Sequence, residues 1–96
     1  MTKADIVNSI SENVGVEKKE TQKVVEAFMD EVRKALQSGN NVYLRGFGTF
    51  QIKQRKEKKG RNITSNTTVT IPAHNIPAFK PSKEFVVAVK NNVEIK

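Results

Sequence analysis

The stretch from residue 53 to residue 66 contains one apolar side chain, Ile63, although the residues on both sides of it alternate as β-strands do. Strands with so few apolar side chains cannot cover a hydrophobic core, and a pair of them alone is only marginally stable. We therefore expect this stretch to form a long antiparallel β-ribbon that projects from the body and becomes ordered when a ligand holds it.

Cationic side chains dominate the predicted ribbon. Six of them fall within nine residues, against Glu57 as the one acid: Lys53, Arg55, Lys56, Lys58, Lys59 and Arg61. Because successive side chains of a strand point to opposite faces, these cations project from both faces of the ribbon. The two sets are Lys53, Arg55 and Arg61 on one face, and Lys56 and Lys58 on the other. This arrangement suits a ribbon that lies in a groove with phosphates on each side.

The charge of the whole chain is divided unevenly. Residues 1–44 carry six Lys and Arg against seven Asp and Glu, whereas residues 45–96 carry eleven against three. The net charge is +7 and the isoelectric point is near 9.9. Such a division suggests a near-neutral scaffold joined to a surface that binds a polyanion. A basic face that is merely solvated is the alternative.

The apolar content is low for a chain that must fold alone. At 96 residues, with 36% hydrophobic residues and no Trp, we expect one domain with a small core. A core shared between two copies of the chain would relieve this shortage.

Several classes of protein are excluded by what the sequence lacks. There is no Cys, which rules out disulfides, zinc fingers and thiol catalysis. Because no window approaches 18 apolar residues and the N-terminus has no signal-peptide core, we expect a soluble cytoplasmic protein with no membrane partner. His74 has no triad-like neighbours, and the turn at residues 46–48 lacks the Lys-Ser/Thr of a P-loop. We therefore expect no enzyme, metal, cofactor or small-molecule substrate, and an exposed His74 at the base of the ribbon.

Two amphipathic helices are predicted before the strands. Thr2 and Asp5 form a capping-box pattern, which predicts a first helix over residues 3–14 that ends at Gly15. A second helix is predicted over residues 18–38, with an apolar stripe made of Val25, Phe28, Met29, Val32, Ala35 and Leu36. A short Gly-containing link also fits a helix-turn-helix. The balanced charge of both helices argues against either one lying in a DNA groove.

A change of period from 3.6 to 2 predicts strands after residue 41. The turn at residues 46–48 separates a strand with Val42 and Leu44 from one with Phe50 and Ile52. The ribbon returns through residues 67–71, and Pro72 and Pro77 are expected to bracket the end of that strand. A last helix is predicted to begin at Ser82 as N-cap, with an apolar side made of Phe85, Val86 and Val89, and a tail from residue 91.

Three motifs in order resemble the HU/integration host factor family of bacterial DNA-bending, histone-like proteins, and an HU-like member in particular. They are Gly46-Phe47-Gly48-Thr49-Phe50, then Gly60-Arg61-Asn62, then Ile76-Pro77-Ala78-Phe79-Lys80-Pro81-Ser82-Lys83. The resemblance covers all but about the last six residues. It implies an α+β fold: two N-terminal helices, a three-stranded antiparallel sheet with a long β-ribbon arm, and a short C-terminal helix, in an intertwined homodimer. Residues 1–40 would dimerise, residues 41–81 would form a β saddle with an arm at about 53–72, and residues 82–96 would form the last helix and tail.

The resemblance also implies the function and the residues that perform it. The partner would be double-stranded DNA of the nucleoid, which the protein would bend and compact. As in the family, the arms would bind in the minor groove with little sequence dependence, and bent, nicked or cruciform DNA would be preferred. DNA contacts would come from Lys3, Gly46, Phe47, Lys53, Arg55, Lys56, Lys58, Lys59, Arg61, Asn62, Ile63, Lys80 and Lys83, with Gly46 and Phe47 offering backbone N–H groups. The dimer core would contain Phe28, Val32, Leu44, Phe47, Phe50 and Phe79.

The arm departs from the family pattern at its tip and on its returning strand. Ile63 stands where the family has an intercalating Pro, and Asn66 stands where it has a Gly. Because Ile is still an accepted wedge, we expect bending to be retained but shallower, or more dependent on the flexibility of the site. Thr67, Thr68 and Thr70 replace cations, so affinity would rely on the outgoing strand. A subunit of an integration-host-type heterodimer and an RNA-binding basic protein stay open as alternatives.

Overall fold

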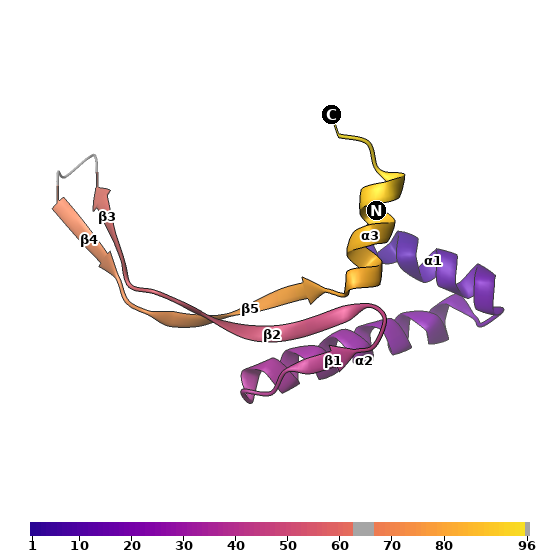
Figure 1. Cartoon of the computed structure of the whole chain (residues 1–96). Coiled ribbons are helices and arrows are strands. Elements are labelled where there is room, and N and C mark those ends of the chain that lie inside the picture. Colours follow the sequence, from indigo (N-terminus) through magenta and orange to yellow (C-terminus); the bar gives the residue numbers. More distant parts are fainter. Residues whose placement is uncertain (63–66, 96) are drawn as a thin grey trace.

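The computed structural model describes residues 1–62 and 67–95, which form three helices and five strands (Figure 1). Two helices precede the strands and one follows them, so the element order is that of the predicted α+β fold. In chain order the elements are α1 (Lys3–Val14), α2 (Lys18–Gln37), β1 (Val42–Leu44), β2 (Gly48–Arg55), β3 (Lys58–Asn62), β4 (Thr67–Ile71), β5 (His74–Pro81) and α3 (Lys83–Asn92).

The start and end of α1 follow from local hydrogen bonding. The Asp5 N–H donates to Thr2 Oγ1 at 3.3 Å, and the Thr2 N–H donates to the Asp5 carboxylate at 2.9 Å. These two bonds are the predicted capping box. Gly15 ends the helix in the left-handed region at φ 75°, where a side chain would be strained. Both predicted boundaries of this helix are therefore confirmed.

The sheet and the arm form one continuous antiparallel ribbon. The three-stranded sheet has the order β1-β2-β5, and β3 pairs with β4 in the arm. The register that pairs Arg55 with His74 also pairs Lys58 with Ile71, because the offset between the two strands is unchanged. The strands therefore cross residues 56–57 and 72–73 without a slip, as one continuous ribbon (Figure 1). The alternation of faces accordingly continues from the sheet into the arm.

Pro77 does not lie beyond a strand as the sequence led us to expect, because it is inside β5, opposite Ile52 on β2. The Ile52 N–H points toward β1, where the Asn41 side-chain oxygen accepts it at 3.1 Å. Since the N–H and C=O of one strand residue point to the same side, Ile52 and Pro77 form a non-hydrogen-bonded pair. The missing N–H of Pro77 thus faces the open edge of β5, where no ladder bond is lost.

The last helix is longer than predicted. Ser82 Oγ accepts the Phe85 N–H at 3.2 Å, which confirms Ser82 as the N-cap of α3. The helix then continues through Asn92, two residues into the predicted tail. The Asn92 side-chain amide donates to the Ala88 carbonyl at 2.7 Å and supports this last turn.

The apolar side chains gather on one face of the sheet without being covered. The ring centroid of Phe79 lies 5.1 Å from that of Phe47 and 4.9 Å from that of Phe50. Among the described residues, Val7 is the one buried hydrophobic side chain, and Phe47 and Phe79 remain 46% and 37% exposed. The accessible surface is 8467 Å², whereas roughly 5,500 Å² is typical of a folded monomer of this mass. One chain therefore builds only part of a core.

Candidate nucleic-acid interface

The continuous register places four exposed cations among the predicted DNA-binding residues on one face. We call the face of the ribbon that carries Phe50 and Phe79 the inner face, and the opposite one the outer face. On the outer face lie exposed cations of the sheet and of the arm: Lys53, Arg55, Lys59 and Lys80. Exposed Lys56 and Lys58 fall on the inner face. The predicted division of cations between two faces is thus present. The outer-face cations extend from the sheet into the arm, and the same alternation places Glu57 between Arg55 and Lys59.

The two strands of the arm differ in chemistry. Outgoing strand β3 contains Lys58 and Lys59 and ends with Arg61 and Asn62, which pair with Thr68 and Thr67. Returning strand β4 carries exposed Val69 and Ile71 on the inner face. The arm charge is therefore on the outgoing strand, as the sequence predicts. The predicted wedge, Ile63, and the family-divergent Asn66 lie outside the described residues.

The turn between β1 and β2 is fastened to the start of α3. The Ser82 N–H donates to the Phe47 carbonyl at 2.9 Å, and Ser82 Oγ donates to the Gly46 carbonyl at 3.0 Å. The Phe47 N–H donates within the turn to the Leu44 carbonyl at 3.0 Å. This amide is therefore occupied and not offered to a ligand, contrary to the expectation from the family resemblance. Gly46 adopts φ 82°, a conformation that the tight turn requires.

A cleft that the sequence did not reveal opens beside this turn. Its volume is about 450 Å³, and it lies between the end of the sheet and the start of α3. Three cations line it, Arg45, Lys80 and Lys83, together with the aromatic ring of Tyr43. Strand alternation was the available signal for Tyr43, because its neighbours Val42 and Leu44 are half-buried while Tyr43 is 74% exposed.

Lys3 and His74 have different surroundings in the structure. Lys3 joins the two N-terminal helices through an ion pair with Glu26 at 3.3 Å, in which both side chains are about half exposed. His74 is exposed at the base of the arm, as predicted, on the outer face opposite Arg55, with Nδ1 3.0 Å from the Pro72 carbonyl oxygen. The Lys3 ammonium therefore already has a carboxylate partner, Glu26, within the chain.

The described residues show neither a cluster of metal ligands nor a membrane-spanning helix. Within residues 1–62 and 67–95, no three His, Asp or Glu side chains converge as metal ligands would. None of the helices described above combines the length and the apolar character needed to cross a membrane.

Comparisons with known proteins agree with this architecture. The family described as "Bacterial DNA-binding protein" matches residues 1–90. DNA-binding protein HU of Geobacillus stearothermophilus is 41% identical over 90 residues, which cover 94% of this chain and 100% of that protein. Integration host factor subunit alpha of Aliivibrio fischeri (strain MJ11) is 36% identical over 91 residues, 95% of this chain and 93% of that protein.

A solved structure carries the same fold. The HU protein in an Anabaena HU–DNA cocrystal structure aligns with a TM-score of 0.88 at 37% identity, covering 93% of this chain and 97% of that one. HU from Thermotoga maritima has the same fold, with a TM-score of 0.66. These matches do not support the helix-turn-helix alternative. The chain belongs to the bacterial DNA-binding protein family of HU and integration host factor.

Proposed function

We propose that this HU-type architectural DNA-binding protein, which is not an enzyme, works as an intertwined homodimer that binds duplex DNA in the minor groove and bends it. The observation that carries the proposal is the set of outer-face cations that extends from the sheet into the arm. A surface of this kind matches a polyanion that extends past the edge of a protein body.

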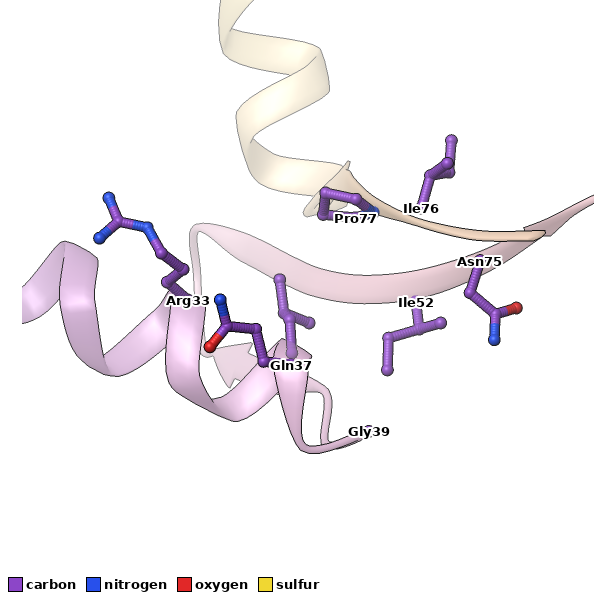
Figure 2. Close-up of a pocket in the computed structure, with 8 residues that line it drawn as sticks. Arg33, Gln37, Gly39, Ile52, Asn75, Ile76 and Pro77 are labelled. Carbon is purple, nitrogen blue, oxygen red and sulfur yellow. The ribbon is translucent and has the colours of Figure 1, made fainter.

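The first part of the proposal is the homodimer. The predicted core residues Phe28, Phe47 and Phe79 stay 47%, 46% and 37% exposed in one chain, so they have contact area left for a second copy. Val32, Leu44 and Phe50 are half-buried and belong to the same proposed core. A hollow of about 480 Å³ between the end of α2 and strands β2 and β5 supports this assignment (Figure 2). Ile52 and Pro77 line it, and a partner chain would fill it.

We assign a separate role to each part of the single domain. Residues 1–40 would interlock with the partner, residues 41–81 would form the saddle with its arm at about 53–72, and residues 82–96 would complete the end of the saddle. The radius of gyration supports an arm that projects from the body, since it is 18.9 Å, against roughly 12–13 Å for a compact chain of this length. The arm accounts for the elongated shape, whose extents are 58 × 34 × 28 Å (Figure 1).

The second part is electrostatic capture. Lys53, Arg55 and Lys59 on the arm and Lys80 on the sheet would displace condensed counterions from phosphates, which makes affinity fall as salt rises. Contacts in the same groove would also come from Lys56, Lys58, Arg61 and Asn62. Contacts with the DNA backbone beside the saddle would come from Lys3, Gly46 and Lys83. Because these groups meet phosphates and groove edges, sequence preference would be weak. Such binding would place the protein on the nucleoid.

The third part is bending by the arm tip. Ile63 would insert between two base pairs, and the bend would bring more DNA onto the saddle. Unstacking costs on the order of a few kcal/mol per step, so nicked, gapped or cruciform DNA, where stacking is already broken, would bind more tightly. Ile has rotamer freedom and an amide that Pro lacks, so the bend would be shallower than with Pro.

One experiment separates capture from bending. Förster transfer between dyes at the ends of a short duplex would be measured with the wild type, Arg61→Ala, Ile63→Ala and Ile63→Pro. We expect Arg61→Ala to weaken all duplexes alike and lower the salt slope by about 1. Ile63→Ala should reduce the bend with little loss of affinity for linear duplex, and Ile63→Pro should deepen it. An unaltered bend in Ile63→Ala, or no preference for nicked DNA, would reject the wedge.

A further inference from the structure

We infer that the cleft beside the β1–β2 turn binds one unpaired nucleotide of a DNA strand that adjoins the bound duplex. The base would stack on Tyr43, and its phosphates would meet Arg45, Lys80 and Lys83. This inference rests on the proposed DNA binding and adds to it a site for a single-stranded segment.

The position of Tyr43 is the first observation. It pairs with Thr49, and Thr49 pairs with Lys80, so the three residues form one row across β1, β2 and β5 on the outer face. Tyr43 is 74% exposed. The ring thus lies on the face that carries the cations, away from the apolar inner face that a partner chain would cover. An aromatic ring this exposed has no packing role within the chain.

The ring is also held in place. Asn41 Oδ1 accepts the Ile52 N–H at 3.1 Å, which fixes the Asn41 amide against β2. The Nδ2 of the same amide donates to Tyr43 Oη across a long 3.5 Å bond. The far end of the ring is therefore tied to the sheet, and stacking on it would cost little rotamer entropy.

The cleft supplies what a nucleotide needs besides the ring. Arg45, Lys80 and Lys83 line it, and none of the residues that line it is acidic. Its volume of about 450 Å³ lies within the range of sites that hold small organic ligands. Thr49 and Ser82 add hydroxyl groups.

The need for a stacking partner indicates that the ligand of the cleft is an unpaired strand and not the duplex. In a duplex the faces of the bases are covered by their neighbours, and only their edges reach a groove. Along a duplex, a ring such as Tyr43 therefore finds no free base face away from the ends, whereas every unpaired base offers one, and proteins that bind single strands combine such rings with cations in this way. The ligand is accordingly a strand end or gap beside the duplex that the arms hold.

The sequence offers a direct probe, because Tyr43 is the one Tyr of the chain and there is no Trp. Tyrosine fluorescence of the wild type would be followed during titration with a blunt duplex and with the same duplex extended by a short oligothymidine strand. Fluorescence anisotropy of dye-labelled DNA would give the affinities of the wild type, Tyr43→Phe and Tyr43→Leu for both DNAs. We expect the extended DNA to bind at least about fivefold more tightly than the blunt DNA. It should also quench the Tyr43 emission, which the blunt DNA should leave unquenched.

The readout for the variants is the ratio of the two affinities. Tyr43→Phe should keep the ratio, since the ring remains, whereas Tyr43→Leu should bring it to about one. Lys53→Ala, a change in the arm, should weaken both DNAs and keep the ratio. An unchanged ratio in Tyr43→Leu, or equal quenching by both DNAs, would overturn the inference. Failure of the wild type to bind the blunt duplex would instead overturn the proposed function, and circular dichroism would confirm that each variant is folded.

Discussion

Phe79 on β5 lies directly opposite Phe50 on β2, with their ring centroids 4.9 Å apart, yet 37% of Phe79 remains exposed. Aromatic rings paired in this way normally form the centre of a core and are covered on all sides. Here the uncovered side lies on the inner face of the sheet. The pair therefore marks the surface at which a second chain is needed.

Replacing Phe79 with Ala should destabilise the protein by about 3 kcal/mol, because it removes contacts within the chain and the contact surface of the proposed partner. Urea unfolding followed by circular dichroism would measure this loss. Ile95→Ala serves as the control, since Ile95 is fully exposed and its truncation should change nothing. Equal midpoints for the two variants would show that Phe79 is not part of a core.

Replacing Gly48 with Ala should destabilise the protein strongly, although it adds only one methyl group. A Cβ at this position would lie 2.6 Å from the Lys80 carbonyl oxygen and 2.6 Å from the Phe79 ring, so β2 and β5 would have to separate. We expect a loss of about 2 kcal/mol in the free energy of unfolding. At Gly60, where the nearest such atom is 4.0 Å away, the same change should be tolerated. If the two variants have the same Tm, the close approach of β2 and β5 at Gly48 does not constrain the sheet.

Ser82 makes two contacts that two substitutions can separate. Ser82→Ala loses both the N-cap of α3 and the bond to the Gly46 carbonyl, for an expected loss of about 1 kcal/mol or somewhat more. Ser82→Asp can still accept the Phe85 N–H but cannot donate to Gly46, so it should restore the helix and leave the turn loose. Amide hydrogen exchange would report the two regions separately. Identical protection of the turn in both variants and the wild type would contradict this division.

Cations on the outer face should contribute to DNA affinity, whereas Lys23 on α2 should not. Lys53→Ala should lower the slope of log affinity against log salt by about 1, because one phosphate contact is lost. Lys23 on α2 provides the matched control, since it is 67% exposed and pairs with Glu20 at 3.6 Å on the helical side. Lys23→Ala should leave the slope unchanged. Equal slopes for both variants would remove the outer face from the interface.

Much of the fold could be predicted because its signals are local. The capping box at Thr2 and Asp5, the ribbon between residues 53 and 71 and the N-cap at Ser82 each depend on neighbours in sequence. Pro77 was misplaced because its tolerance depends on which side of β2 the Ile52 N–H points. The pairing of β2 with β1 and β5 sets that side, and local sequence does not reveal it.

The candidate site was predictable in its charge and not in its shape. The arm cations stand out as a run, whereas the cleft with Tyr43 arises only when the turn at residues 45–47, the end of β5 and the start of α3 come together. The occupied N–H of Phe47 was missed for a related reason, since the turn geometry that engages it is set by Gly46 at φ 82°.

The central claim is that two copies of the chain complete one core. Sedimentation equilibrium at micromolar concentration tests it most directly, together with urea unfolding at several protein concentrations. We predict a folded species of twice the 10.8 kDa chain mass, with an unfolding midpoint that rises with concentration. A folded monomer whose midpoint does not depend on concentration would contradict the account.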